Sequence, residues 1–300
     1  MTLCLAVLLD FVLGDPRIIP HPVSLIGRLI DYLKAKIFTD TNSFIQGLAV
    51  CILTLLTVSL FVFLILYISS CNIIVQIYLL YSALAWRDLK DETAPVLSCL
   101  MAHDLPNARK YLSRVVGRDT DMLNETEITR AVIETIAENS IDGIISVIFF
   151  AAIGQALNTS YGAALCVWLF KASSTLDSMI GYEEFHEFGK ASARLDDILN
   201  FIPARLGGVI IAGRKGFHVF IHDRLKHKSP NSAHGESAFA GVLGVRLGGG
   251  AYYGGKFETR PYLNPDGRDP EPFDIIRAWR LLDSSCALFA FLVILLVWRT

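Results

Sequence analysis

The chain has 300 residues, of which 53% are hydrophobic and 19% are charged, and its formal net charge is −2. A slightly negative balance argues against nucleic acid as a partner. The six cysteines are scattered without a CxxC pair, which predicts reduced, buried side chains rather than disulfides or a zinc site. Residues 41–86 contain no Asp, Glu, Lys or Arg, a run long enough for two membrane crossings of about 20 residues each. The composition therefore predicts a polytopic membrane protein.

In chain order, membrane segments are expected near residues 3–14, 48–68, 73–86, 143–170 and 281–298. Residues 143–157 and 163–170 flank a polar turn, and neither half is long enough to cross a bilayer. A re-entrant or tilted hairpin is therefore expected, with a single tilted crossing as the alternative. Residues 198–212 are interrupted by Pro203 and Arg205, so they are expected to be interfacial or buried rather than spanning.

The positive charges are consistent with the hairpin. Seven Lys and Arg lie in residues 87–130 and fifteen in residues 171–280, and a hairpin places both groups on one face, the cytoplasmic one. The expected fold is all-α: a polytopic integral membrane protein in which residues 1–300 form a single membrane-embedded domain. Residues 87–139 and 171–280 are expected to form its cytoplasmic helical and Gly-rich loop segments.

Residues 130–142 combine charge with the start of an apolar segment. On a helix, Arg130, Glu134, Glu138 and Asp142 recur every four residues and share one face. The following residues, 143–170, carry no charge at all, and carboxylates beside a membrane segment are costly unless they are paired, hydrated or metal-bound. Two interpretations stay open: a solvated face supported by an Arg130–Glu134 pair, or one wall of a functional site.

Local signals predict three further features before and after this helix. Asp104 and Pro106 indicate a helix start, residues 115–120 (VVGRDT) a loop, and Asn124 or Thr126 the cap of the charged helix. Residues 250–256 fit the phosphate-loop pattern GxxxxGK, but Phe257 stands where Ser or Thr should bind magnesium and no buried strand is expected before it. We reject that assignment. The Gly-rich segment 241–255 could still bind phosphate through its N–H groups, and tight packing is the alternative.

Carboxylates and cations also cluster next to apolar surface in residues 171–206. Such clusters suit magnesium–nucleotide chemistry, in which cations bind phosphates and carboxylates bind the metal, and structural salt bridges explain them equally well. The residues concerned are Lys171, Asp177, Arg194, Asp196, Asp197 and Arg205. Farther on, Ser229 and Asn231 in an SPN turn could offer a hydroxyl and an amide to a ligand. Three histidines, His218, His222 and His227, lack the ligand spacing of a zinc site.

Taken together, the motifs resemble those of one known family. GDPRIIPHPVSLIGRLI, VVGRDT, ETIAENSIDG, STLDSMIGY, ARLDDILNFIPARL, SPN and AGVLGVRLGGGAYYGG occur here in the order expected of the CobD/CbiB family of cobalamin biosynthesis. The resemblance covers residues 14–255. It implies an integral membrane enzyme that uses ATP with Mg²⁺ to join aminopropanol, or its phosphate, to the free propionate of adenosylcobyric acid. It also implies a cell (inner) membrane location with the active site on the cytoplasmic face, and the lipid bilayer and other corrin-pathway enzymes as partners.

This resemblance gives the charged motifs candidate roles. Glu134, Glu138 and Asp142 are expected to lie with Asp177 and Asp196 around Mg²⁺–ATP. Asp196 and Asp197 are the expected metal ligands, and either Glu138 or His21 is the expected base for the amine, which must lose a proton to attack. The groups expected to bind phosphates or the corrinoid carboxylate are Lys171, Arg194, Arg205, Ser229 and Asn231.

Two rival functions come from other classes of protein. A membrane transporter of a small metabolite or corrinoid precursor predicts ionisable residues in the middle of the membrane, whereas here they gather at one interface. A scaffold that anchors soluble enzymes has no need of several carboxylate and cation motifs in separate loops. The sequence therefore favours a membrane enzyme.

Overall fold

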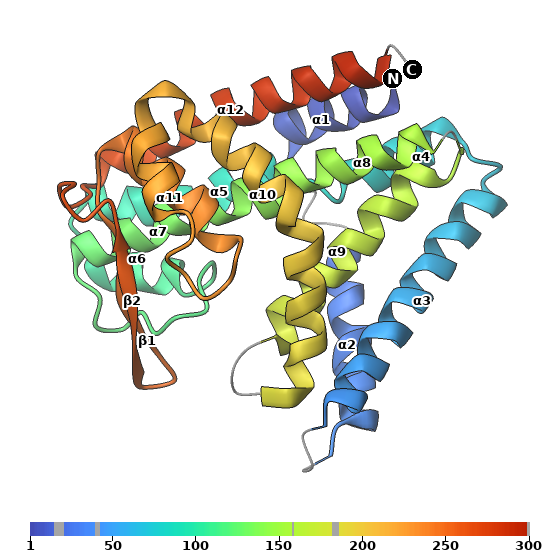
Figure 1. The fold of residues 1–300 in the computed structure, drawn as a ribbon, viewed down its shortest axis with the longest axis horizontal. Helices are drawn as coiled ribbons and strands as arrows, with labels where there is room; N and C mark the ends of the chain where they lie inside the picture. The colour runs from blue at the N-terminus through green and yellow to red at the C-terminus, as the bar shows by residue number, and fades with distance from the viewer. Residues whose placement is uncertain (15–20, 40–42, 158, 182–185, 299–300) are drawn as a thin grey trace. The chain divides into compact units, whose positions relative to one another are not determined.

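The computed structural model describes residues 1–14, 21–39, 43–157, 159–181 and 186–298. The predicted helical class is confirmed, with one exception: a two-stranded antiparallel hairpin (Figure 1). The chain divides into two compact units. Unit 1 comprises residues 1–85, 146–200 and 290–300, and unit 2 comprises residues 86–145 and 201–289.

Unit 1 is entirely helical in its described part. It contains α1 (Thr2–Leu13), α2 (Pro22–Ile37), α3 (Phe44–Ile68), α4 (Ile73–Tyr81), α8 (Ser146–Ala156), α9 (Gly162–Ile180) and the first part of α10 (His186–Asp223). Helices α8 and α9 form a closely packed pair at Gly154 and Gly162. A Cβ added to either glycine would lie 2.1–2.2 Å from the carbonyl oxygen of the other, so only glycine permits this approach. The two apolar halves thus pack against each other, and their arrangement in a membrane, as a re-entrant or tilted hairpin, stays a prediction.

Among the residues that the structure describes, three helices are long and apolar enough to cross a membrane, judged by length and composition: Phe44–Ile68, Glu125–Ala156 and Phe273–Val297. Helix α3 exposes many large apolar side chains, including Leu56, Phe61 and Ile68, which suits a lipid environment. Helix α4, by contrast, has nine residues and a length of about 14 Å, shorter than the crossing expected at residues 73–86.

The segment before α8 also differs from the prediction. Residues 143–157 do not begin a new short element, because one continuous helical run extends over Glu125–Ala156. It consists of α7 (Glu125–Asn139), the π-helical segment η1 (Ser140–Ile145) and α8. The uncharged stretch begins at Gly143, whereas the helix begins 18 residues earlier, at Glu125 next to the predicted cap, so the charged helix and the apolar segment are one run.

Unit 2 carries the remaining elements. They are α5 (Trp86–Met101), α6 (Leu105–Leu112), α7, η1, the second part of α10, α11 (Ser232–Leu243), β1 (Leu247–Tyr253), β2 (Lys256–Leu263) and α12 (Phe273–Trp298), which ends in unit 1. Two predicted helix starts are confirmed. Asp104 caps α6 by accepting the Asn107 N–H, and Asn124 caps α7 through a reciprocal capping box with Glu127.

The Gly-rich segment is not the predicted loop. Strand β1 pairs with β2 from Leu247 opposite Leu263 to Tyr253 opposite Lys256. The two strands are joined by Gly254 and Gly255, whose φ angles are 55° and 78°. Two consecutive positive φ values are the requirement of a tight two-residue hairpin turn, which glycine meets without strain.

Helix α10 continues through Pro203, and the expectation that residues 198–212 are interfacial or buried rather than spanning stays a prediction. The helix breaks at Gly213, where φ is 47° and ψ is −150°. A proline removes one intrahelical hydrogen bond and can be accommodated within a long helix. The backbone at Gly213 lies in a region that other residues rarely adopt, so this glycine sets the kink.

Candidate functional site

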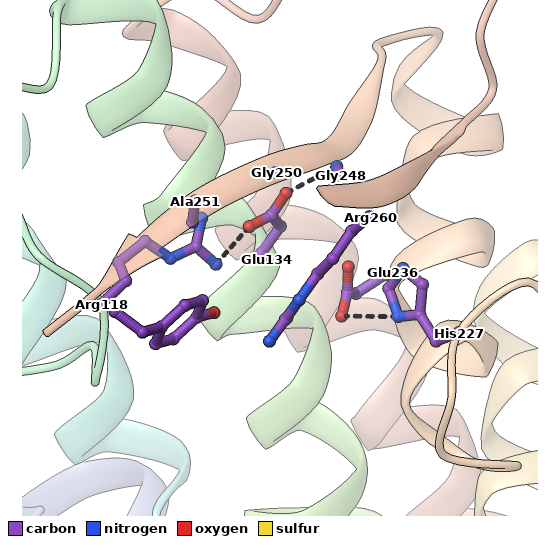
Figure 2. A pocket seen from close by; sticks show the side chains of 9 residues that line it. Arg118, Glu134, His227, Glu236, Gly248, Gly250, Ala251 and Arg260 are labelled. Atoms are coloured by element: carbon purple, nitrogen blue, oxygen red, sulfur yellow. Dashed lines mark hydrogen bonds and ion pairs between the residues drawn. The ribbon is translucent and has the colours of Figure 1, made fainter. Parts of the chain in front are cut away.

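A small pocket in unit 2 brings together charged side chains from several separate parts of the chain (Figure 2). They come from the loop after α6, from α7, from the segment after α10, from α11 and from strand β2. The residues that line it are Arg118, Glu134, His227, Glu236, Gly248, Gly250, Ala251, Tyr253 and Arg260. Four of the nine, Arg118, Glu134, Glu236 and Arg260, are acids or arginines. They are far apart in the sequence, so no local sequence pattern predicts that they meet.

Glu134 organises this pocket. Its side chain is buried, with Oε2 accepting a hydrogen bond from Arg118 at 2.6 Å and Oε1 accepting the Gly248 N–H at 2.6 Å (Figure 2). Both bonds are charge-assisted and therefore among the stronger hydrogen bonds in proteins. One carboxylate thus joins helix α7 to the loop that precedes it and to strand β1.

Asp119 holds that loop against the hairpin. Its carboxylate accepts the N–H groups of Gly254 at 3.1 Å and Gly255 at 2.7 Å, and its own N–H donates to the Tyr252 carbonyl at 2.8 Å. The tight Gly-Gly turn presents both N–H groups to one acceptor. As a result the neighbouring Arg118 is fixed at the pocket by its backbone as well as by Glu134.

Arg260 reaches the pocket from β2. Its guanidinium lies 5.1 Å from the centre of the Tyr253 ring, and within the described residues it forms no hydrogen bond or ion pair (Figure 2). A guanidinium presents five donors suited to carboxylate and phosphate oxygens. The pocket therefore contains a cation that is positioned by an aromatic ring but not neutralised by direct contact.

His227 and Glu236 lie side by side in the same pocket. Nδ1 of His227 is 3.7 Å from Oε1 of Glu236 and 3.3 Å from the Ser232 hydroxyl oxygen. The side chains of His227 and Glu236 are only 7% and 8% exposed. Nε2 of His227 is buried and, among the described residues, has no hydrogen-bond partner.

The surroundings of this pair favour its uncharged form. Burial raises the pKa of Glu236 well above its usual range, and the carboxylates of Glu134 and Glu138 raise it further. Burial lowers the pKa of His227, and Arg260 adds to that effect. A neutral acid and a neutral imidazole side by side can hold or pass a proton near neutral pH.

The predicted charged stripe is only partly retained. Arg130 pairs with Asp269 at 3.1 Å, whereas Glu134 accepts from Arg118 at 2.6 Å, so the Arg130–Glu134 pair that supported the first of the two interpretations is wrong. Glu138 lies one turn along α7 and is not among the residues that line the pocket. Asp142 lies in η1, where hydrogen bonds span five residues instead of four, so the four-residue periodicity of the prediction does not apply there.

Three of the predicted ligand-binding residues lie together elsewhere in unit 2. Arg205 donates to Oδ1 of Asn231 at 3.1 Å, and the Asn231 N–H donates to the Ser229 hydroxyl at 3.2 Å. The Arg205 guanidinium also stacks on the Phe201 ring at 3.4 Å. These contacts join the SPN turn to α10. They are compatible with a ligand-binding role and with a purely structural one.

The other predicted site residues belong to unit 1. Lys171 and Asp177 lie on α9, and Arg194, Asp196 and Asp197 lie on the first part of α10. His21 caps α2, its Nδ1 accepting the Val23 N–H at 3.3 Å. The grouping of these residues with Glu134, Glu138 and Asp142 around one Mg²⁺ stays a prediction. Within the described part of the chain, no three His, Cys, Asp or Glu side chains are arranged to hold a metal ion.

Sequence reasoning missed Arg118, Glu236, Tyr253 and Arg260. Arg118 lies in the VVGRDT segment, which the sequence predicts to be a loop. Its two adjacent charged residues, Arg118 and Asp119, are the signal that could have indicated a binding role, because binding residues are often carried on loops. Glu236 and Arg260 carry no such signal, because their nearest charged partners in the pocket are remote in sequence. His227 was considered solely as a zinc ligand.

Comparison with known proteins gives a consistent result. Residues 3–282 match the family model described as CobD/Cbib protein. Proteins named "Cobalamin biosynthesis protein CobD" are similar along most of their length. The one from Pelobacter propionicus is 42% identical over 278 residues, covering 87% of this chain and 84% of the relative. The one from Geobacter metallireducens is 41% identical over 296 residues, covering 92% and 88%. No solved structure matches. The chain therefore belongs to the CobD/Cbib protein family.

Proposed function

We propose that this protein acts in cobalamin biosynthesis as an ATP-dependent carboxylate–amine ligase. It would attach aminopropanol, or its phosphate, to the free propionate of adenosylcobyric acid. The names of its relatives support the pathway. The observation that supports the chemistry is the pocket around Glu134, where the unneutralised Arg260 lies beside a buried His227–Glu236 pair.

The reaction places clear demands on such a site. A carboxylate is a poor electrophile, so ATP first transfers its terminal phosphoryl group to the propionate, giving an acyl phosphate and ADP. The amine nitrogen then attacks the carbonyl carbon, the carbon–oxygen bond to phosphate breaks, and phosphate leaves. A protein accelerates these steps by aligning the reactants, stabilising oxyanions and excluding water.

Arg260 is our candidate for the oxyanion contact. In the proposed complex its guanidinium binds the substrate carboxylate and then the acyl phosphate, because its donors have no other partner in the described residues. Arg118 has a supporting role, since its bond to Glu134 is already made. Lys171, Arg194 and Arg205, with Ser229 and Asn231, remain our candidates for the other phosphates and carboxylates of the substrates.

Magnesium enters this proposal with ATP. Mg²⁺ prefers oxygen ligands and is often held by one or two carboxylates together with substrate phosphates. Glu134 does not fit that role well, because both of its oxygens already accept hydrogen bonds. Asp196 and Asp197 are the proposed ligands, and Asp142, Asp177 and Glu138 are the proposed neighbouring carboxylates. When bound, the ion would offset phosphate charge.

We also place the protein in the cell (inner) membrane. The three long apolar helices in the described part of the chain suit that location, and the corrinoid and the amine would be its soluble partners. The pocket is proposed to face the cytoplasm, where ATP is available.

The test uses the full-length protein purified in detergent. It is incubated with adenosylcobyric acid, Mg²⁺–ATP and either aminopropanol or its phosphate, and the corrinoid products are identified by mass spectrometry. We expect a product heavier by the amine minus one water, with one ADP formed per product. Folded protein that ligates neither amine would refute the proposal, and so would product formation that is independent of ATP.

A further inference from the structure

We propose that His227 accepts the proton of the attacking amine at its Nε2 atom, while Ser232 and Glu236 orient the ring through Nδ1. This inference rests on the proposed ligation and goes beyond it, because it names the base. The bases predicted from the sequence, Glu138 and His21, differ from His227 in placement. Glu138 does not line this pocket, and His21 has its Nδ1 engaged in the cap of α2.

The ring of His227 has two chemically different edges. Nδ1 faces two oxygen atoms: the Ser232 hydroxyl oxygen at 3.3 Å, and Oε1 of Glu236 at 3.7 Å (Figure 2). The tautomer with hydrogen on Nδ1 suits these neighbours, and it leaves a lone pair on Nε2. A base held by a third group through its second nitrogen is a recurrent arrangement in enzymes.

The Nε2 edge is the unusual one. This atom is buried and, in the part of the chain that the structure describes, has no hydrogen-bond partner, although its residue lines the pocket. A buried polar atom without a partner has lost its hydration without gaining a replacement hydrogen bond, so such atoms are rare in folded proteins. A substrate amine that enters the pocket would supply the missing partner.

The charges around His227 keep it in the form that a base needs. The ionisable groups that line the pocket with it are Glu236 on α11, Arg260 on β2, Tyr253 on β1, Glu134 on α7 and Arg118 in the preceding loop. Burial and then Arg260 lower the pKa of His227, and Glu134 opposes them. The imidazole is therefore neutral at physiological pH and able to accept a proton. Once it has done so, the Glu134 carboxylate stabilises the imidazolium.

The proposed step balances as follows. The amine nitrogen forms a bond to the acyl carbon of the acyl phosphate, and the carbon–oxygen bond to phosphate breaks with its electron pair leaving on phosphate. The proton released by the nitrogen moves to Nε2 of His227. Arg260 lines the same pocket as His227 and would bind the oxyanion of the acyl group. The amine and the acyl phosphate would therefore meet between these two side chains.

Hydroxylamine separates this step from the activation step. It is largely unprotonated at neutral pH and attacks acyl phosphates without a base, giving a hydroxamate. The experiment compares the wild-type protein with His227→Gln in detergent, using Mg²⁺–ATP and adenosylcobyric acid, with either hydroxylamine or the two amines as nucleophile. The control is His222→Gln, which alters an exposed histidine on α10 outside the pocket.

We expect His227→Gln to lose about 10²-fold or more in ligation of both amines, as is typical for loss of a general base. Hydroxamate formation should stay within about threefold of wild type, which also shows that the variant is folded. The wild-type ligation rate should fall as the pH drops through the lowered pKa of His227, because protonated His227 cannot act as base. This contribution should be absent from the variant, which keeps only the fall caused by protonation of the amine itself. His222→Gln should behave as wild type.

Two results would overturn the assignment. In the first, His227→Gln ligates the amines at nearly the wild-type rate. In the second, it loses hydroxamate formation and ligation equally while its melting temperature is unchanged, which would mean that His227 acts in activation or substrate binding. A wild-type protein that forms no ATP-dependent hydroxamate and no amide would instead refute the ligation itself, and the inference with it.

Discussion

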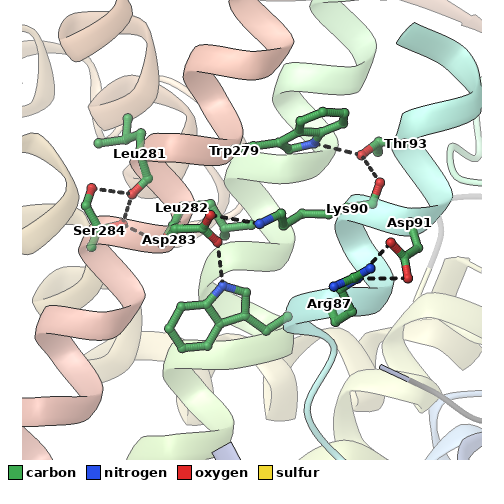
Figure 3. A network of polar contacts seen from close by, with 11 residues as sticks. Arg87, Lys90, Asp91, Thr93, Trp279, Leu281, Leu282, Asp283 and Ser284 are labelled. Carbon is green, nitrogen blue, oxygen red and sulfur yellow. Dashed lines mark hydrogen bonds and ion pairs between the residues drawn. The ribbon is translucent and has the colours of Figure 1, made fainter. Parts of the chain in front are cut away.

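Unit 2 contains two polar clusters that differ in how completely their members are paired. The first joins α5 to α12 (Figure 3). Asp283 accepts the Trp86 ring N–H at 2.9 Å and the Lys90 ammonium at 2.8 Å, and the Trp279 ring N–H donates to the Thr93 hydroxyl at 3.0 Å. Every one of these side chains therefore has a partner within the cluster.

The second cluster is the pocket of Figure 2, which pairs Glu134 with Arg118 but leaves other groups without a direct hydrogen bond among the described residues. They include the Arg260 guanidinium and Nε2 of His227. Polar groups in folded proteins are normally satisfied. The α5–α12 cluster, in which the side chains are paired, therefore holds two helices together. The pocket, in which some polar groups are not paired, has groups that can bind a ligand. Four substitutions test this difference.

The largest effect is expected for Glu134→Ala. It leaves the Arg118 guanidinium buried without its carboxylate and removes the acceptor of the Gly248 N–H. Breaking such a buried pair costs about 3–5 kcal/mol. Thermal unfolding in detergent should show a clearly lowered melting temperature, together with loss of ligation. A melting temperature equal to wild type would contradict the central place that we give to this carboxylate.

Arg260→Gln should act on activity and not on stability. No carboxylate loses a direct partner when this side chain is changed, whereas loss of one oxyanion contact slows a reaction about 10²–10³-fold. The measurement is the ligation rate beside the melting temperature. The matched control is Arg114→Gln, an exposed arginine that also lies over a tyrosine ring, 5.0 Å from that of Tyr111. Equal rates for the two variants would remove Arg260 from the proposed site.

Lys90→Met should give the opposite result. It removes one of the two partners of Asp283, and both side chains of the Lys90–Asp283 pair are partly exposed, at 25% and 33%. Loss of a hydrogen bond to a charged group of this kind lowers the free energy of unfolding by about 1–3 kcal/mol. The rate per folded molecule should equal that of wild type. A selective loss of ligation would show that the α5–α12 cluster is more than structural.

Arg87→Gln should have the smallest effect. Arg87 pairs with Asp91 one turn along α5, and both side chains are about half exposed, at 45% and 44%. Solvent and salt screen such pairs, which contribute about 0.3–0.5 kcal/mol. Melting temperatures of the wild type and the variant should converge as salt is added. A shift as large as that of Lys90→Met would contradict the distinction between an exposed pair and a shared cluster.

Much of the local structure could be predicted from the sequence. Uncharged runs indicate apolar helices, and side chains next to a helix start indicate its cap, as at Asp104 and Asn124. These signals depend on residues within a few positions of one another. The same local reasoning failed where a local rule has an exception: Gly254 and Gly255 permit a tight hairpin turn, and the π-helical turns of η1 change the periodicity at Asp142.

The sequence by itself determined the predominantly helical class, the membrane-compatible helices and the family, because composition, hydropathy and motif order are properties of the linear chain. Only the tertiary structure decided which groups meet Glu134. Its two partners, Arg118 and Gly248, lie 16 residues before it and 114 residues after it. Arg118 takes the place of Arg130, the partner that helical spacing favoured. Spacing along a helix constrains neighbours three or four residues apart. The pairing of a buried carboxylate depends on which loop and which strand the fold brings to it.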